Sequence, residues 1–303
     1  MRTKLPVSVV IPTLGRPLLE QCLRSILACR PGPEEVVVVD QSGSDAIVAI
    51  LARLGSDDVR RIPCEGRGIA RAMNRGLAAA RHDVVLVTHD DCTVSPDWVE
   101  EAEGLAQAHP GAIVTGRVLP PDGSRYVPST KTDPEPHDYT GEIISGVLYP
   151  ANMVASRDAI QAIGGFDERP GFRVAAEDND LCYRWLVDGR PFRYEPALVV
   201  WHHDWRTPEQ LVKTHRAYAR AQGCFYAKHL HARDRRVLPM LRWDLRAAAR
   251  TTARGLLHRE PRWTDAYREM HLPLLAGLVV GWREAGALAR TPARDVEGGS
   301  PQR

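Results

Sequence analysis

The chain has 303 residues, which is enough for one large domain with an appendage or for two small domains. Hydrophobic residues make up 44% of it and charged residues 26%, as in an ordinary soluble globular protein. The formal net charge is only +2, which argues against a protein that binds nucleic acid through bulk charge.

The cysteine pattern and the hydropathy bear on the compartment. Six cysteines are scattered along the chain without a CxxC pair, so no zinc site is expected, and cysteines in apolar segments are typical of core residues in a reducing compartment. The residues MRTKLP lead directly into the first predicted strand and leave no room for a signal peptide. No apolar run reaches the ~20 residues that cross a bilayer. These features predict a cytoplasmic protein.

Apolar runs alternate with helical patterns in the first part of the chain. Unbroken valine-rich runs predict buried strands, and apolar residues three or four positions apart predict the helices between them. The strands are predicted at residues 7–11, 36–39, 59–62, 84–87 and 112–118, and the helices at 16–30, 44–54, 69–77 and from 95 onward. This alternation is typical of a doubly wound α/β sheet with mainly parallel strands.

The second part is less regular. Residues 119–142 are rich in proline and polar residues and lack periodicity, which predicts a loop or lid. Compact structure is predicted from 152 to 201, with helices at 157–163 and 177–187, the turn GGFDE between them, and the strand ALVVW. Residues 206–290 have a helical, arginine-rich pattern, and the tail 291–303 is predicted to be disordered.

Acidic residues close two of the buried strands. Asp40 follows the run 36–39, and Asp90–Asp91 follow the run 84–87. Open α/β sheets bind ligands outside the carboxyl ends of their strands, where carboxylates can hold a hard cation and a diphosphate. Glu177–Asp178 and His202–His203 come later in the chain. The set predicts the transfer of a group from a nucleotide.

Six motifs resemble those of family 2 glycosyltransferases of the GT-A fold, and they occur in the same order. They are VSVVIPTLGRP, VVVVDQSGSD, GIARAMNRGLAAA, VVLVTHDDCTVSPDWVE, GGFDE and AEDNDLCYRW, and together they cover residues from about 5 to 205. The resemblance implies an α/β, GT-A (Rossmann-like) fold with a mixed, mainly parallel sheet flanked by helices. The implied catalytic domain is 1–205, with a nucleotide-sugar-binding half at 1–118 and an acceptor half at 143–205. A C-terminal helical extension at 206–290 follows.

The resemblance also implies residue roles. Asp91 binds Mg²⁺ or Mn²⁺ together with a histidine, for which His202 is chosen although His203 next to it stays open. Asp178 is the base that deprotonates the acceptor, with Glu177 and Asp180 orienting it or the acceptor. The residues implied to bind the nucleotide sugar are Pro12, Thr13, Asp40, Arg71, Asn74, Asp90 and Asn152.

The chain departs from the family pattern at two positions. His89 stands where an acid is common, and Gln41 stands where many relatives have a second aspartate after Asp40. Because Asp40 is implied to contact the base, the identity of the base stays open, and UDP-, dTDP- and GDP-linked donors all fit.

The sequence therefore predicts an inverting, metal-dependent glycosyltransferase that acts on a hydroxyl of a glycan, a lipid-linked sugar or a small molecule. A nucleotidyltransferase is an alternative, although the loop LGRPLLEQ has only one glycine and one arginine where such enzymes usually have several. A non-catalytic nucleotide-sugar-binding protein is a second alternative, against which the acids Asp91 and Asp178 argue.

The helical region 206–290 mixes arginines with apolar residues such as Leu211, Tyr218 and the run LPLLAGLVVGW at 272–282. A basic helix with an apolar face can lie on a membrane whose surface is anionic. It can equally pack on the sheet or on a second subunit of a homodimer. The sequence leaves open peripheral contact with the inner face of the membrane and packing within the protein.

Overall fold

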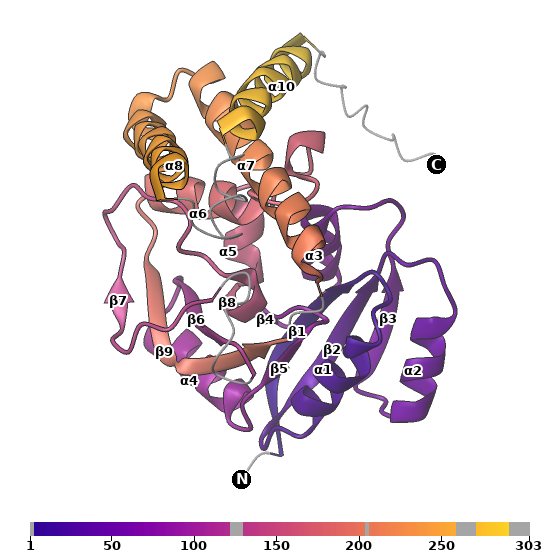
Figure 1. Ribbon diagram of the computed structural model, residues 1–303. Helices are drawn as coiled ribbons and strands as arrows, with labels where there is room; N and C mark the ends of the chain where they lie inside the picture. The colour runs from indigo at the N-terminus through magenta and orange to yellow at the C-terminus, as the bar shows by residue number, and fades with distance from the viewer. Residues whose placement is uncertain (1–2, 122–129, 204–205, 259–270, 291–303) are drawn as a thin grey trace, which may run out of the picture.

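The structure is a computed structural model that describes residues 3–121, 130–203, 206–258 and 271–290. A single mixed sheet lies toward one end of the molecule, and three long helices gather at the other end (Figure 1). The strands are β1 (Lys4–Thr13), β2 (Gly32–Asp40), β3 (Val59–Pro63), β4 (Val84–Val87), β5 (Cys92–Val94), β6 (Ile113–Leu119), β7 (His137–Asp138), β8 (Met153–Ser156) and β9 (Phe192–His202). The helices are α1 (Leu18–Leu27), α2 (Ala46–Leu54), α3 (Ile69–Ala79), α4 (Trp98–Ala108), α5 (Arg157–Ala162), α6 (Glu177–Val187), α7 (Pro208–His231), α8 (Leu238–His258) and α10 (His271–Arg290).

The strands lie in the order β3-β2-β1-β4-β8-β6-β9-β5, and β7 pairs with the edge of β9. β3, β2, β1 and β4 run parallel, as the alternating pattern predicts. β8 runs antiparallel to both β4 and β6, and β5 runs antiparallel to β9, which itself is parallel to β6. The predicted α/β class with a mixed sheet, flanking helices and a C-terminal helical extension is confirmed.

Both faces of the sheet are covered, which explains the unbroken apolar runs in its strands. On one face, Val10 and Val39 pack with α3, α5 and α6, including the buried Trp185. On the other, Val9 and Val38 pack with α1, α2 and α4. Fully burying one such aliphatic side chain stabilises a fold by roughly 1.5–3 kcal/mol.

Several local predictions differ from the structure. β5 and β8 are absent from the prediction, because strands of three and four residues are too short to show a period. The helix expected from Ser95–Pro96 begins at Trp98, after a turn in which the Trp98 N–H donates to the Ser95 carbonyl over 3.0 Å. The expected loop 119–142 includes β7, while residues 122–129 and the tail 291–303 lie outside the described residues.

The C-terminal helices form a third core with η2 (Pro170–Phe172) and α6. Phe172, Ala176 and Tyr183 are buried there against α7, α8 and α10. A capping box starts α7: the Thr207 Oγ1 accepts from the Gln210 N–H over 3.3 Å, and the Gln210 Oε1 accepts from the Thr207 N–H over 2.8 Å. None of the helices in the described part of the chain has both the length and the hydrophobicity that a membrane span requires.

Glycines let α7 and α10 approach closely. A Cβ atom added at Gly277 would lie 1.9 Å from the backbone oxygen of Arg220, and one added at Gly223 would lie 2.2 Å from that of Leu274. No side chain fits at these distances, so the two helices pack through bare backbone.

Candidate active site

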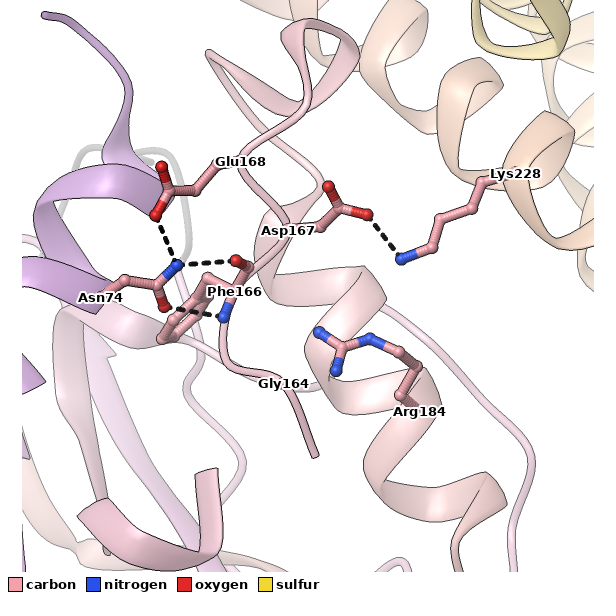
Figure 2. Close-up of a pocket in the computed structure, with 7 residues that line it drawn as sticks. All are labelled: Asn74, Gly164, Phe166, Asp167, Glu168, Arg184 and Lys228. Atoms are coloured by element: carbon pink, nitrogen blue, oxygen red, sulfur yellow. Dashed lines mark hydrogen bonds and ion pairs between the residues drawn. The ribbon is translucent and has the colours of Figure 1, made fainter. Parts of the chain in front are cut away.

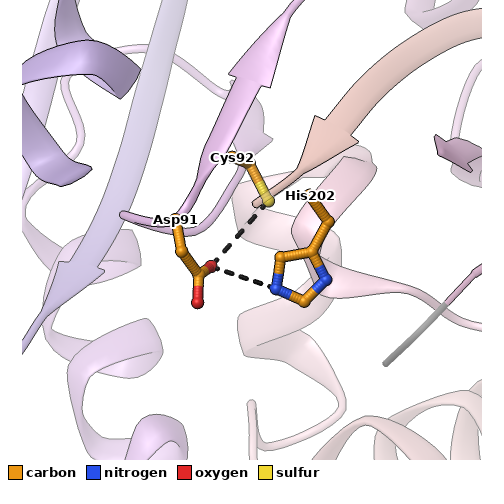
Figure 3. Close-up of side chains that lie close together, drawn as sticks. All are labelled: Asp91, Cys92 and His202. Carbon is orange, nitrogen blue, oxygen red and sulfur yellow. Dashed lines mark hydrogen bonds and ion pairs between the residues drawn. The ribbon is translucent and has the colours of Figure 1, made fainter. Parts of the chain in front are cut away.

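The predicted metal ligands Asp91 and His202 lie side by side. Antiparallel pairing of β5 with β9 places Cys92 opposite His202, which brings the preceding Asp91 to the end of β9 (Figure 3). The Oδ1 of Asp91 lies 3.3 Å from the Nε2 of His202, and both side chains are buried. His203 instead hydrogen-bonds Thr93 over 3.0 Å, so His202 is the histidine that faces Asp91.

Cys92 completes the one group of three potential metal ligands among the described residues. Its thiol lies 4.0 Å from Asp91, and burial raises the pKa of Cys92 well above its ordinary value. A thiol held protonated is a poor ligand for a hard cation. Asp91 and His202 are therefore the useful donors of this group.

The electrostatics keep Asp91 charged. Burial acts to raise the pKa of Asp91, but the hydrogen bond and charge of His202 outweigh it and hold the pKa well below its usual range. His89 also faces this centre, and burial lowers the pKa of His89 to about 4. Its Nε2 is buried without a hydrogen-bond partner among the described residues. The centre thus offers a charged carboxylate, while His89 is not among the side chains whose donor atoms lie close enough together to share a cation.

Thr13 and Asp90 meet beside this centre, at the ends of two neighbouring strands. The Thr13 hydroxyl donates to Asp90 over 2.6 Å, and Arg16 donates to the other oxygen of Asp90 over 2.5 Å. Burial raises the pKa of Asp90, while the charge of Arg16 opposes that rise. Pro12 is buried in β1 just before Thr13. Arg16 was not singled out from the sequence, although it lies in the first motif.

Asp40 lies one strand further along the same edge, directly opposite Thr13 in the β1–β2 register. Its Oδ1 accepts from the Ser42 N–H and hydroxyl over 2.7 and 2.6 Å, and its Oδ2 accepts from Arg61 over 2.8 Å. Burial acts to raise the pKa of Asp40, but these bonds outweigh it and lower the pKa. The Arg61 Nη2 also lies 2.7 Å from Oδ2, and the Asp40 side chain is fully buried, so its acceptor positions are taken up within the protein.

Arg71 and Asn74 lie on one face of α3, as predicted, and both contact the segment GGFDE. Arg71 pairs with Glu168 over 3.2 Å and is half-exposed. Asn74 donates to the Phe166 carbonyl over 2.8 Å and accepts from the Phe166 N–H over 2.9 Å (Figure 2). The amide of Asn74 therefore holds the turn, whereas Arg71 remains accessible.

Asn152 does not fit its predicted role in binding the donor. It is fully buried, and it accepts from the Trp98 indole N–H while donating to the carbonyls of Arg117 and Leu198, each over 2.9 Å. An amide with all these bonds made inside the core fixes β6, β9 and α4 to one another. Its burial and its saturated bonding leave nothing for a ligand.

Glu177 and Asp178 open α6 next to a strained residue. Ala176 has φ = 67°, in the left-handed region that non-glycine residues rarely adopt. Burial raises the pKa of Glu177 well above its ordinary value, and the negative charge of Asp178 adds to the rise. Burial likewise raises the pKa of Asp178, although the Asn179 N–H donates to it over 2.7 Å. A carboxyl pair with raised pKa values at a strained helix start suits acid–base chemistry.

Asp180 has a different environment from the one expected for a residue that orients the base. Its buried carboxylate accepts from Arg184 over 2.8 Å, from Lys228 over 2.6 Å and from His229 over 2.9 Å. Lys228 and His229 belong to α7. Asp180 therefore joins α6 to the C-terminal helices instead of facing the acceptor.

α7 brings residues to the site that the sequence did not indicate. Burial raises the pKa of Tyr218, which is close enough to Arg206, Asp178, Glu177 and Asp91 for their charges to act on it. Tyr218 thus lies in the neighbourhood of both the predicted base and the predicted metal ligand. No spacing in the sequence could show this, because the helix that carries Tyr218 lies beyond the recognised motifs.

A polar cavity of about 430 Å³ lies behind the GGFDE turn (Figure 2). Lys228 reaches over it to Asp167, with 2.7 Å between Nζ and Oδ2, while Arg184 and Glu168 line it from other sides. Its charged groups are paired with one another, so it has little to attract a diphosphate. Asp91 and Asp178 lie outside its lining. We therefore locate the candidate site at the carboxyl ends of β1, β2 and β4, where Asp40, Asp90 and Asp91 lie.

Comparisons with known proteins identify the family of the chain. The family model for glycosyl transferase family 2 matches residues 8–163, which is more than half of the chain. The chain belongs to glycosyl transferase family 2. It is 27% identical over 197 residues to the glucosyl-dolichyl phosphate glucuronosyltransferase of Haloferax volcanii, covering 59% of this chain and 62% of that protein. It is 29% identical over 222 residues to the pre-mycofactocin glycosyltransferase of Mycobacterium tuberculosis, covering 66% of this chain and 43% of that protein. The chain thus spans less than two thirds of either relative.

Solved structures of glycosyltransferases share the fold of this family member. The mannosyltransferase PcManGT from Pyrobaculum calidifontis, in complex with GDP-Man and Mn²⁺, superposes with a TM-score of 0.53 at 20% identity, covering 93% of this chain and 73% of that one. S. aureus TarS 1–349 in complex with UDP-GlcNAc superposes with a TM-score of 0.55 at 17% identity, covering 94% and 92%. At these identities the likeness establishes the GT-A fold and nothing finer.

Proposed function

We propose that this protein is an inverting glycosyltransferase that moves a sugar from a nucleotide-diphosphate sugar to an acceptor hydroxyl, with a divalent cation. The observation that carries the proposal is the pairing of Asp91 with His202 at the sheet edge, 3.3 Å apart and near the raised-pKa pair Glu177–Asp178. Family membership supports the transferase class.

The donor atoms at this edge fit a divalent cation. Asp91 supplies a charged oxygen and His202 supplies a nitrogen, 3.3 Å apart. A carboxylate with an imidazole suits Mn²⁺ better than Mg²⁺, which prefers oxygen ligands and water. When bound, the cation would stabilise the negative charge of the leaving diphosphate. The Mn²⁺ in the PcManGT complex supports this choice.

The donor nucleotide would lie along the carboxyl ends of β1, β2 and β4. Asp40 would accept a hydrogen bond from the base only in exchange for one that it now accepts from Ser42 or Arg61. Thr13 and Asp90 would contact the ribose, and the accessible guanidinium of Arg71 would contact the base or the diphosphate. Asn74 would act on the sugar only indirectly, by fixing the GGFDE turn.

Asp178 is proposed to be the general base. The acceptor oxygen bonds to the anomeric carbon while the bond from that carbon to the diphosphate oxygen breaks. The proton of the acceptor hydroxyl passes to Asp178, which must be ionised beforehand. Glu177, whose pKa is raised further, would stay protonated and hold its neighbour's geometry.

UDP-, dTDP- and GDP-linked sugars remain the candidate donors. The two curated relatives act, by their names, on a lipid-linked sugar and on a mycofactocin precursor, and these support lipid-linked and small-molecule acceptors. A glycan acceptor stays a third candidate.

The chemistry can be identified from the products of donor breakdown. The protein is incubated with each class of nucleotide sugar and Mn²⁺, and the products are measured by mass spectrometry. We expect a nucleoside diphosphate. Pyrophosphate as the released product would identify a nucleotidyltransferase, and binding without any turnover would identify a non-catalytic protein.

Two variants test the assigned residues. Asp178→Asn should reduce transfer by roughly 10²–10⁴-fold while nucleotide binding is kept, because it removes only the base. Asp91→Asn should weaken the Mn²⁺-dependent binding of the nucleoside diphosphate in titration calorimetry. Asp188→Asn, at the exposed end of α6, is the matched control and should change neither quantity. Transfer within a few-fold of wild type in Asp178→Asn would rule out this base.

A further inference from the structure

One face of α10 is apolar and exposed. Leu272, Leu275, Val279 and Trp282 are exposed by 78%, 47%, 53% and 51%. Their spacing of three, four and three residues places them on one side of the helix. Of the exposed side chains described on α10, only Arg283 is charged. The opposite side of α10 packs on α7 through Gly277 and its neighbours, so the apolar side faces outward.

α8 adds a basic face at the same end of the molecule. Arg242, Arg246 and Arg250 are exposed and spaced four residues apart, so they form one row along the helix. Trp243, exposed by 65%, lies beside them. α8 and α10 contact each other and lie at the end of the molecule away from the N-terminus (Figure 1). We call the four α10 side chains and these four α8 side chains the distal surface.

Charge is strongly segregated toward this end. Residues 206–290 contain 17 arginines and lysines against seven aspartates and glutamates, whereas the whole chain has a formal net charge of only +2. The rest of the chain is therefore acidic. The net charge is small because the positive charge of the helical region nearly cancels the negative charge of the α/β region.

The apolar face of α10 could be covered by a second copy of the chain or by a lipid bilayer, and the positive charge of the helical region distinguishes the two. A second copy of this chain, docked face to face, would bring two strongly basic regions together, and like charges oppose such a contact. An anionic bilayer offers a partner to each half of the distal surface, the apolar and the basic. Arginines are attracted to lipid phosphates, and tryptophan and leucine side chains settle at the headgroup boundary.

We propose that the distal surface docks on the anionic surface of a phospholipid bilayer. The side chains Leu272, Leu275, Val279 and Trp282 enter the headgroup region, and the arginines of α8 contact lipid phosphates. α10 lies in the plane of the surface and does not cross the membrane. Glu284 of α10 also accepts from the Gly171 N–H over 3.0 Å, so the docked helix is joined to the short helix η2 that precedes Ala176 and α6.

Co-sedimentation with vesicles tests the proposal without any need for enzyme activity. The wild-type protein should sediment with vesicles of phosphatidylglycerol and phosphatidylcholine at low salt. It should bind far less at high salt and far less to phosphatidylcholine alone. The protein staying in the supernatant with anionic vesicles at low salt would overturn the proposal.

Matched variants assign the binding to the surface. Leu275→Glu with Val279→Glu, and separately Arg242→Glu with Arg246→Glu, should each weaken vesicle partitioning by more than roughly tenfold. Val48→Glu, which replaces an exposed apolar residue on α2, is the control and should partition like wild type. Because all these positions are exposed, circular dichroism should show an unchanged fold.

Two outcomes would point to other occupants. Light scattering that shows a wild-type dimer, which the Leu275→Glu/Val279→Glu variant dissociates, would assign the surface to a second copy if vesicle binding is absent. Binding to duplex DNA that exceeds vesicle binding at equal phosphate concentration would assign it to nucleic acid. Either result overturns the membrane proposal.

Discussion

At the scale of single residues, the start of α6 combines two features that are unfavourable for stability. Ala176 has a left-handed backbone, and two carboxyl groups lie together behind it with raised pKa values. A fold selected only for stability would separate these charges. Their persistence beside Asp91 and Tyr218 is typical of a functional site.

The raised pKa of Asp178 predicts the pH dependence of transfer. The base works only when ionised, so activity should fall as the pH drops through the pKa of Asp178 in the folded protein. Because burial raises that pKa, the midpoint of this acid limb should lie clearly above the ordinary carboxylate value of about 4. The dependence of kcat/KM on pH measures it. A limb at the ordinary value would exclude Asp178.

The same raised pKa also predicts how stability depends on pH. Activity needs the charged form of Asp178, whereas the charged form lowers the stability of the folded protein. A raised carboxyl pKa means that the folded state disfavours the charged form, so the charge lowers stability above the pKa of the unfolded chain. Asp178→Asn should therefore raise the melting temperature at neutral pH and change it less below about pH 4. Thermal denaturation at the two pH values provides the comparison. A lower melting temperature at neutral pH would contradict it.

The location of a residue could be predicted from the sequence where a motif lies at a strand end, and it could not where the partners come from distant segments. Asp40, Asp90 and Asp91 share one edge because parallel strands end together. Asn152 is assigned to the donor only through the family resemblance. Its burial depends on Trp98 and Leu198, whose positions no local pattern gives.

At the scale of elements, helices with strong periodicity could be predicted and very short strands could not. β5 is three residues long and is defined only by its antiparallel partner β9. That pairing is what places Asp91 against His202. The sequence could therefore indicate the two ligands through the resemblance, yet it could not show which of the two adjacent histidines faces the carboxylate.

The α7–α10 contact gives a prediction about glycine. Gly277→Ala should destabilise the protein by roughly 1–3 kcal/mol, since the added methyl group would overlap the Arg220 backbone oxygen. Gly286→Ala, in the same helix, should stabilise it by up to about 1 kcal/mol, because its methyl group has room and alanine favours helix. Urea denaturation of both variants checks the pair. Equal effects of the two substitutions would refute close packing.

At the scale of the whole molecule, one buried carboxylate joins the sheet and the C-terminal helices. Asp180 accepts bonds from Arg184 on its own helix and from Lys228 and His229 on α7. Asp180→Asn should cost up to roughly 3 kcal/mol, because the partly buried Arg184 would lose its counter-charge and Lys228 would keep only Asp167. Chemical denaturation measures the loss, and the exposed Asp188→Asn should stay within about 0.5 kcal/mol of wild type. An equal, small effect of both would show that the network contributes little.

Asp178 and Asp180 are two positions apart on one turn of α6, and this has a consequence for building chimeric enzymes. The motifs end near residue 205, which invites a cut there when the catalytic part is grafted onto another protein. Such a fragment would lack the two α7 partners of Asp180 and the packing partners of Phe172 and Tyr183. The helix that carries the proposed base would then have no structure to pack against on that side. A transplantable unit must therefore extend through α7 and α10, and the foreign segment can be joined only after them.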